Sequence, residues 1–282
     1  MSVLSYQDII RELGKGIYFH PLKLSPKPKE PKGSIRVSDL CFTASENAYS
    51  MGLEKPLPIQ TESNPDKPNE EQKFFYIPSR DTVLIWTDES VWLSNKFRGP
   101  LYSVVEPASK GLGHIGTRVN PRWVGVLCIP LHNVSDKPLR IDVRNVNKPI
   151  AYMAIEKLSS SSNPDSEDNA GRMDLIMGKP NNQAILEFYN SKNENSWMTD
   201  REKLKARMEE SKEYKELTEG FKDKLLGFLG SSEDTRWNRI NMIVNILILG
   251  LATLIAALTY LNSHQSPNPS PTNIIVTPKS TK

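Results

Sequence analysis

Cysteine and histidine are scarce in this chain, which has two cysteines and four histidines among 282 residues. Cys41 and Cys128 lie in apolar runs, so we expect buried reduced thiols rather than a disulfide. The scattered cysteines and histidines show no metal-ligand spacing, so no metal site is predicted. A charge excess is also missing, because 36 Lys and Arg stand against 33 Asp and Glu. This balance argues against a broad nucleic-acid-binding surface.

Charge is completely absent from one long apolar run, residues 240–261. Its length suits a helix that crosses a hydrocarbon core of about 30 Å. The alternative is a buried core helix, but Trp237 and Tyr260 at the two ends suit the two membrane interfaces. Arg236 and Arg239 directly precede the run, so the positive-inside rule places the N-terminal part in the cytoplasm. No signal segment opens the chain, which agrees with a single-pass membrane protein whose short tail, 262–282, lies outside.

The first 158 residues have the pattern of a mainly β domain. From 106 to 158, short apolar runs alternate with turn formers at the spacing of a compact all-β fold. A short helix is predicted for 4–13, with Ser5 as its cap. Proline-rich polar residues from 54 to 72 indicate an exposed excursion. Strands are expected at 17–24, at 34–43 with a possible bulge, at 74–86 with a break at Pro78, at 90–93, at 101–105 and at 123–131.

Residues 159–198 are predicted to be a linker with possible extra strands, because 159–171 is almost free of apolar residues. An amphipathic helix is expected over 199–230, where Thr199 and Glu202 form the pattern of a capping box. Its apolar stripe could pack on its own domain, form a self-associating stalk above the membrane, or bind the membrane surface.

Several segments of residues 1–158, in order, resemble the dCTP deaminase and dUTPase superfamily. They are LSYQDIIRELGKGIYFHP, YIPSRDTVLIWTDESVWLSNKFRGPL, TRVNPRWVGVLCIPLHNVSDKPLRI and NVNKPIAYMAIEKL. The third is similar to the family's I-D-P-G-W-x-G run with the strand and turn that follow it. The resemblance implies a distorted β-barrel of the dUTPase-like type, a homotrimer, and a nucleotide bound between subunits. If the protein is active, it also implies Mg²⁺ bound with the nucleotide.

Three positions depart from the family pattern. Glu106 stands where the family has an arginine that handles phosphates. Pro130 stands where the deaminases have their general base, and it cannot accept a proton. Asn120 replaces the aspartate with which dUTPases orient water, and an amide stays neutral. A strand-like run around Glu187 resembles the deaminase strand that carries the base, but the flanking turns are missing, so we interpret this similarity as chance.

We therefore assign no catalytic residue. The candidate nucleotide-binding residues are those of the glycine-rich loop and the turn after it: Ser109, Lys110, Gly111, Gly113, Arg118, Asn120 and Arg122. His114 and His132 are interpreted as solvent-facing, and so are the two arginines unless they contact phosphate across a trimer interface.

The first functional hypothesis is a membrane-anchored nucleotide-binding or sensing module that lacks the usual catalytic carboxylates. An active dCTP deaminase or dUTPase is the alternative, and a trimeric membrane scaffold is the third possibility.

Overall fold

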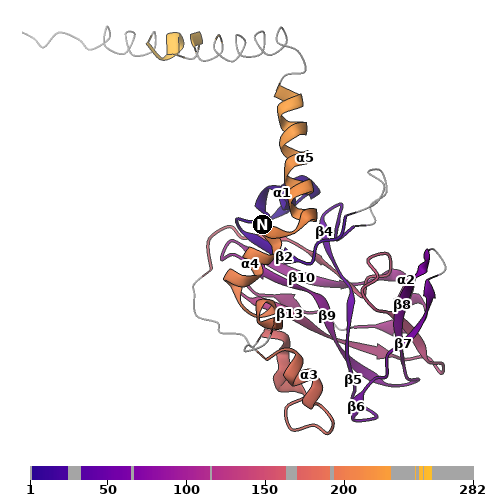
Figure 1. Ribbon diagram of the computed structural model, residues 1–282. Coiled ribbons are helices and arrows are strands. Elements are labelled where there is room, and N and C mark those ends of the chain that lie inside the picture. Colours follow the sequence, from indigo (N-terminus) through magenta and orange to yellow (C-terminus); the bar gives the residue numbers. More distant parts are fainter. Residues whose placement is uncertain are drawn as a thin grey trace, which may run out of the picture. The chain divides into compact units, whose positions relative to one another are not determined.

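Figure 1 shows the computed structural model, which describes residues 2–24, 33–64, 67–114, 116–162, 170–190, 194–229, 245, 248–249 and 251–255. The chain divides into two compact units, Met1–Phe221 and Lys222–Lys282.

The predicted short helix lies near the start of the first unit, after strand β1 (Ser2–Val3). Helix α1 (Tyr6–Glu12) begins after Ser5, whose hydroxyl accepts from the backbone N–H of Asp8, while the Asp8 carboxylate accepts from the N–H of Ser5. This reciprocal capping box satisfies two N–H groups that would otherwise have no partner within the helix. Ile9 and Ile10 point into the core and are buried. The predicted helix and its cap are confirmed.

The β structure forms three sheets, and every pairing in them is antiparallel. The first sheet has the order β1 (Ser2–Val3), β16 (Glu156–Lys157), β10 (Phe97–Ser103), β15 (Ala151–Ala154), β4 (Asp39–Phe42) and β3 (Ile35–Arg36), with β12 (Arg118–Val119) beside β10. The second has the order β11 (Leu112–Gly113), β13 (Val124–Asn133), β9 (Thr82–Leu93), β5 (Ala44–Ser50) and β6 (Lys55–Pro56), with β2 (Ile17–His20) beside β9. The third has the order β14 (Leu139–Asp142), β8 (Lys67–Ile77) and β7 (Gln60–Asn64).

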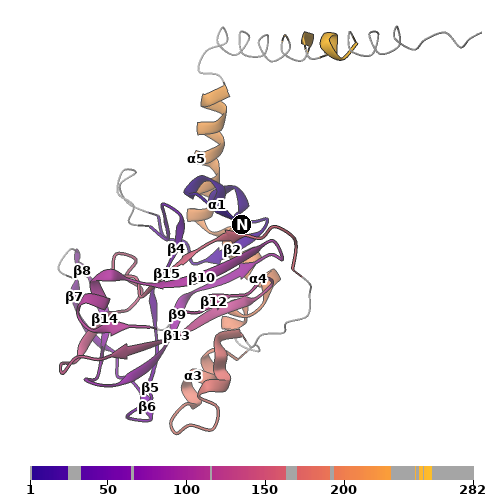
Figure 2. The same ribbon diagram turned by 180° about the vertical axis from the view of Figure 1, so that it is seen from behind.

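The long strands β9 and β13 lie at the centre of this arrangement, and the sheets curl around a common core (Figures 1 and 2). Phe19, Phe42, Leu93 and Ile129 are fully buried there. Side chains that alternate along each strand direct every second residue inward, so the sheets enclose one apolar interior. The predicted mainly β class is confirmed as a curled half-barrel. Both cysteines are unpaired, and burial raises the pKa of each thiol to about 12.

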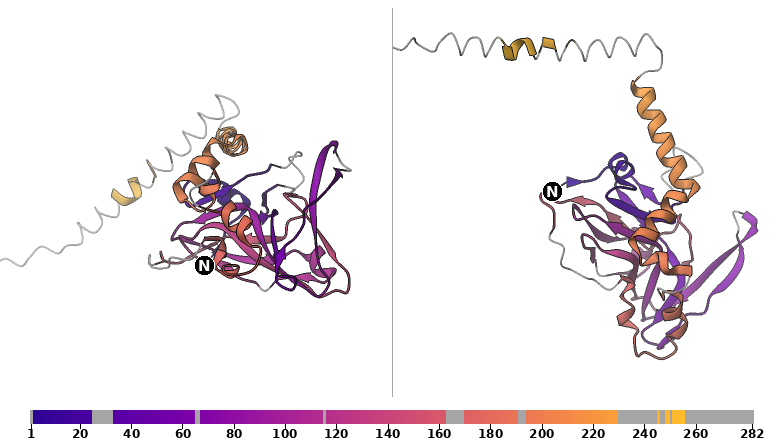
Figure 3. Two further views of the ribbon diagram at one scale, coloured as in Figure 1. Left: turned by 60° about the horizontal axis from the view of Figure 1, so that its bottom comes forward. Right: turned by 60° about the vertical axis from the view of Figure 1, so that its left-hand side comes forward.

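Two predicted segments have more structure than the sequence indicated. The run 34–43 is a hairpin rather than one bulged strand, because β3 and β4 pair around a turn in which Val37 has a φ of 39°. The proline-rich excursion contains the hairpin β7–β8, which extends from the body of the unit (Figure 3). Residues 61–63 are exposed, as predicted for an excursion.

The described parts of the segment after the β domain contain three short helices and no strand, which corrects the prediction of possible extra strands. It contains the 3₁₀ helix η1 (Ala170–Leu175), helix α3 (Gln183–Phe188) and the 3₁₀ helix η2 (Glu194–Met198). Ile185 and Tyr189 are four residues apart, which suits one face of a helix. They cover Tyr49 and Trp86 on the outer side of the second sheet and form a second core cluster with them. We call η1, α3 and η2 the helical cap.

The predicted single helix 199–230 is two helices, α4 (Arg201–Glu210) and α5 (Lys212–Leu229). Asp200, not Thr199, caps α4: its carboxylate accepts from the N–H groups of the second and third helical residues. Ser211 has extended backbone angles and interrupts the helix. Leu204 and Met208 are fully buried against the β domain, so α4 packs on its own domain, one of the three predicted alternatives.

The predicted membrane-spanning segment, 240–261, lies mostly outside the described residues, and the tail 262–282 lies wholly outside them. Within that segment, residues 245, 248–249 and 251–255 are helical. A search of the described part of the chain finds no helix whose length and apolar character would let it cross a membrane.

Candidate functional site

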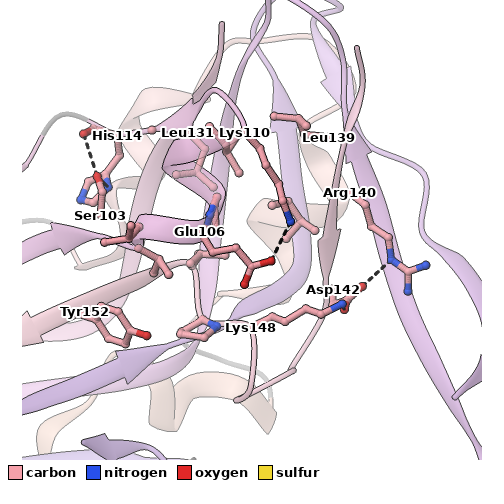
Figure 4. Close-up of a pocket in the computed structure, with 18 of the residues that line it drawn as sticks. Ser103, Glu106, Lys110, His114, Leu131, Leu139, Arg140, Asp142, Lys148 and Tyr152 are labelled. Atoms are coloured by element: carbon pink, nitrogen blue, oxygen red, sulfur yellow. Dashed lines mark hydrogen bonds and ion pairs between the residues drawn. The ribbon is translucent and has the colours of Figure 1, made fainter. Parts of the chain in front are cut away.

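A cavity of about 590 Å³ opens in the first unit where elements of all three sheets meet. Its walls come from the end of β10, helix α2 (Val105–Ser109), β11, β14 and the loop that connects β14 to β15 (Figure 4). Strand β10 ends at Ser103, and the chain then turns through α2 back to β11, which pairs with the end of β13. The glycine-rich loop singled out in the sequence therefore forms one wall of this cavity.

Much of the cavity wall is apolar. Leu112 and Leu131 come from the second sheet, Ile141 comes from the third, and Ile150 precedes β15 of the first; all four are buried. Tyr152 presents an aromatic ring from β15. An apolar cavity with a few polar groups is the usual form of a small-molecule site.

Two ion-paired clusters line the cavity. Lys110 Nζ lies 2.7 Å from Glu106 Oε1 across one turn of chain. Lys148 Nζ lies 2.7 Å from Asp142 Oδ2, and Arg140 Nε lies 2.6 Å from Asp142 Oδ1. The described residues include no group of three or more His, Cys, Asp or Glu that could hold a metal ion.

Both carboxylates in these clusters hold their negative charge strongly. The hydrogen bond from Lys110, followed by its charge, lowers the pKa of Glu106. For Asp142 the largest single effect is burial, which by itself would raise the pKa. The hydrogen bonds from Lys148 and Arg140 and their charges outweigh it, so the pKa of Asp142 is lowered overall. Carboxylates with lowered pKa values are poor proton acceptors near neutral pH.

Arg36 reaches the cavity from β3. Its Nη1 donates to the Tyr152 hydroxyl at 2.9 Å and its Nη2 donates to the Val146 carbonyl at 2.7 Å. The guanidinium also lies over the Tyr152 ring, 5.6 Å from the centroid. Its Nε is buried and has no hydrogen-bond partner among the described residues. One buried donor of this residue therefore has no acceptor among the described residues.

His114 and Ser103 form a pair at another edge of the cavity. Ser103 Oγ lies 2.9 Å from His114 Nδ1 and 3.5 Å from the His114 carbonyl oxygen. Burial, followed by the nearby His132, lowers the pKa of His114, so the imidazole is neutral at neutral pH. Its Nε2 is buried and has no partner among the described residues.

Buried polar atoms without a hydrogen-bond partner occur mainly on residues of this cavity. The described part of the chain has three buried side-chain polar atoms without a partner, on His20, Arg36 and His114. The last two line this cavity. Buried polar atoms are almost always hydrogen-bonded in folded proteins, so each exception calls for an explanation, and an absent ligand or water is one.

The structure brings some of the predicted site residues together and separates others. Lys110 and Gly113 line the cavity. Gly111 has a φ of +90°, and its carbonyl accepts from Val134, so it shapes the loop. Ser109 does not line the cavity, and its hydroxyl donates to the Glu106 carbonyl at 2.8 Å.

The turn residues predicted for phosphate contact also lie elsewhere. Arg118 is exposed on β12, and Asn120 and Arg122 belong to the turn before β13; none of the three lines the cavity. Pro130 lies in β13 opposite Leu84. Glu187 belongs to helix α3 and not to a strand, in agreement with the interpretation that its similarity to a catalytic strand arises by chance.

Sequence reasoning missed most of the cavity's polar residues. They are Arg36, Ser103, Arg140, Asp142, Lys148 and Tyr152. They come from four strands and one loop, and no short motif connects them. Arg140 lies in the segment TRVNPRWVGVLCIPLHNVSDKPLRI, and Lys148 and Tyr152 lie in NVNKPIAYMAIEKL; both segments were noted for their family resemblance, but these residues were not singled out.

No family model matches the chain, and no curated protein is similar to it in sequence. Among solved structures, the chain is similar to a native dUTPase of EIAV, with 16% identity over 54% of this chain and 98% of that one and a TM-score of 0.31. It is also similar to a 2'-deoxycytidine 5'-triphosphate deaminase from Agrobacterium tumefaciens, with 10% identity over 68% of this chain and 53% of that one and a TM-score of 0.39.

A mutant dUTPase from phage phi11 of S. aureus is a further similar structure, with 13% identity over 39% of this chain and 97% of that one and a TM-score of 0.27. Identities this low bear on the fold alone.

Proposed function

We propose that this protein is a membrane-anchored nucleotide-binding or sensing module with a dUTPase-like β domain, and that the nucleotide occupies the cavity beside α2. One observation carries the proposal: a cavity with apolar walls gathers several cationic side chains, and two of its lining residues, Arg36 and His114, each have a buried polar atom without a partner among the described residues. Apolar walls and the Tyr152 ring suit a base or sugar, and the cations suit phosphate.

The lysines of the cavity's ion pairs can donate to a phosphate. The side chains of Lys110 and Glu106 are 60% and 73% exposed, so this ion pair contributes little to stability, and water can solvate Glu106 when a phosphate accepts the hydrogen bond of Lys110. The Lys148 side chain is 64% exposed, whereas its partner Asp142 is only 3% exposed and also pairs with Arg140. A phosphate can accept from another hydrogen of the Lys148 ammonium group while Asp142 keeps its pairing, because an ammonium group has three donors.

Binding without turnover is the activity that the chemistry supports. The two carboxylates of the cavity, Glu106 and Asp142, have lowered pKa values and are held by lysine or arginine. Neither suits the role of a general base toward an attacking water. Mg²⁺ would accompany the nucleotide as part of the ligand, held by its phosphates.

We also propose that residues 240–261 cross the membrane, with the first unit in the cytoplasm. Ile248, Leu249, Leu251, Leu254 and Ile255 are each more than half exposed. At about 100° per residue these side chains spread over roughly 220° of the helix circumference. Such a wide apolar surface requires an apolar environment. Protease protection of the tail 262–282 in sealed vesicles tests this topology, and full digestion from outside a cytoplasm-side-out vesicle would contradict it.

A homotrimer is a further part of the proposal and is supported by the sequence resemblance. Sedimentation of the full chain in detergent, corrected for bound detergent, distinguishes a trimer from a monomer.

Calorimetry on the full chain in lipid nanodiscs tests nucleotide binding. The titrants are the four deoxynucleoside triphosphates with Mg²⁺, and product analysis of each mixture detects released pyrophosphate or deaminated base. We expect binding of at least one nucleotide without turnover. The double variant Lys110→Met, Lys148→Met should weaken it by about tenfold or more, the effect of losing charged hydrogen bonds.

The matched control is Lys179→Met. It removes an exposed lysine that pairs with Glu54 at 3.2 Å away from the cavity, so the affinity should not change. Absence of binding to all four nucleotides would contradict the proposal. Turnover would instead support the alternative, an active dCTP deaminase or dUTPase.

A further inference from the structure

The cavity has two chemically different sides. In Figure 4, Arg140 and Asp142 lie at one side, with Lys148 directed toward Asp142, while Ser103 and His114 lie at the opposite side. The first side is charged and belongs to β14 and the loop after it. The second side carries a hydroxyl and a neutral imidazole, from the end of β10 and from the residue after β11. A ligand that fits both sides must itself have a charged part and an uncharged polar part.

The Ser103–His114 pair is held in place by its own hydrogen bonds. A neutral imidazole has one N–H donor and one nitrogen acceptor. Since Ser103 Oγ contacts Nδ1 at 2.9 Å, that nitrogen is satisfied in either tautomer. The remaining nitrogen, Nε2, is a buried hydrogen-bonding atom without a partner among the described residues. The His114 ring and the exposed Ser103 hydroxyl together form an uncharged polar part of the cavity wall.

The neighbouring His132 shows that this arrangement is specific to His114. His132 lies on β13 directly opposite Gly113, one residue before His114. Its Nδ1 lies 2.8 Å from the Thr82 hydroxyl, and the residue does not line the cavity. Two adjacent histidines, each paired with a hydroxyl, thus differ in that only His114 lines the cavity.

Resting on the nucleotide-binding function proposed above, we propose that Ser103 and His114 recognise an uncharged polar group of the nucleotide, a sugar hydroxyl or an edge of the base, while its phosphates lie at Lys110 and Lys148. A neutral imidazole adds no charge to attract a phosphate, whereas the ammonium groups on the other side do. His114 is then a specificity-determining residue that distinguishes a nucleotide from a bare polyphosphate.

The test compares two probes on the full chain in lipid nanodiscs: the tightest-binding deoxynucleoside triphosphate of the panel and inorganic tripolyphosphate. Both carry the same kind of anion, and only the first has a sugar and a base. The variants are His114→Leu, its matched control His132→Leu, and Lys148→Met. Melting temperatures and circular dichroism establish that each variant is folded.

We expect His114→Leu to weaken the nucleotide by about three- to tenfold, the loss of one neutral hydrogen bond, and to change tripolyphosphate by less than about twofold. Lys148→Met should weaken both probes, and His132→Leu neither. Ser103→Ala should act as His114→Leu does but more weakly, because it frees the ring without removing it. It also serves as the second variant if His114→Leu does not fold.

Equal weakening of nucleotide and tripolyphosphate by His114→Leu would overturn this inference, and so would an unchanged nucleotide affinity. A wild-type chain that binds tripolyphosphate as tightly as every nucleotide would also overturn it while leaving an anion site. A wild-type chain that binds neither probe would instead refute the proposed function, and this inference with it.

Discussion

Two polar clusters of the first unit differ in how their hydrogen bonds are satisfied. One lies around Glu89 on β9, whose side chain is completely buried. Its carboxylate accepts from both the N–H and the hydroxyl of Thr43, each at 2.7 Å. The other is the cavity, where Arg36 Nε and His114 Nε2 are buried without partners among the described residues.

The difference separates polar groups that serve the fold from groups available to a ligand. Thr43 lies between β4 and β5, at the point where the chain passes from the first sheet to the second. Asp88 precedes Glu89 in the chain, and its Oδ1 accepts a hydrogen bond from Arg144 Nε at 2.7 Å. The backbone N–H of Arg144 donates to the Ala44 carbonyl. The Glu89 cluster thus connects the sheets, and the protein supplies its partners. Arg36 Nε and His114 Nε2 have no such partners among the described residues, although both residues line the cavity.

Glu89→Gln should give the largest effect on stability. Burial raises the pKa of Glu89 from 4.5 to about 7, so the folded state favours the protonated form. Its stabilising contribution is complete below the unfolded-state pKa of 4.5 and is lost as the pH rises through 7. The loss amounts to roughly 3 kcal/mol. Urea unfolding from pH 4.5 to 8 should show this fall in the wild type and a flatter profile in Glu89→Gln.

The control for that experiment is Glu71→Gln, which changes an exposed carboxyl on β8. Its profile should follow that of the wild type. If Glu89→Gln and the wild type have parallel profiles, the Glu89 carboxyl group does not stay protonated in the folded state, and the comparison between the two clusters loses its main support.

Thr43→Val should destabilise the first unit by about 1 to 2 kcal/mol, because it leaves one buried Glu89 oxygen without its hydroxyl donor. Thr61→Val, an exposed substitution on β7, should change the unfolding free energy by less than about 0.5 kcal/mol. Chemical denaturation at pH 8 measures both. Equal values for the two variants would mean that the joint between the sheets does not depend on this bond.

Asp142→Asn should have a smaller effect with the opposite dependence on pH. The folded-state pKa of Asp142 is lowered, so its contribution is present above the unfolded-state value of 3.8 and is lost as the pH falls through the folded-state pKa. We expect about 1 kcal/mol of destabilisation at pH 7, because a side chain only 3% exposed loses charged hydrogen bonds. The difference from the wild type should shrink in acid, and a constant difference would contradict the assignment.

Lys110→Met should have the smallest effect on stability and a clear effect on binding. The ion pair with Glu106 is exposed at both ends, so the melting temperature should change by less than about 1 °C. The affinity for tripolyphosphate should fall by several-fold. A variant that melts much lower, with unchanged affinity, would place Lys110 with the groups that serve the fold.

The sequence predicted the elements whose signals are local. The capped helix at Ser5, the break at Pro78 and the strand that became β13 all depend on residues close together in the chain. The helical cap was predicted as linker or extra strands, because its apolar residues, among them Ile176 and Ile185, are sparse. Their role depends on packing in one cluster with Trp86, which lies 90 positions before Ile176 and 99 positions before Ile185.

The candidate site was predicted in part for the same reason. Lys110 and Gly113 belong to a recognisable glycine-rich loop, so the sequence led to one wall of the cavity. Arg36 and Asp142 carry no signal of their own, because their role depends on β3 and β14 reaching the same place from different sheets. Arg118 and Arg122 were predicted from their closeness in sequence to the loop, but the turn before β13 places them outside the cavity.

The helical cap also has a consequence for proteins that resemble this one. Tyr49 and Trp86 are fully buried, and three residues of the cluster that covers them, Ile176, Ile185 and Tyr189, come after position 158. A relative that ended its chain near that point would expose two large aromatic rings to water, and exposed apolar surface favours aggregation. Such a relative must have smaller or polar residues at those two positions, or cover them with another chain. The residues aligned with Tyr49 and Trp86 would therefore record whether an ancestor carried the cap.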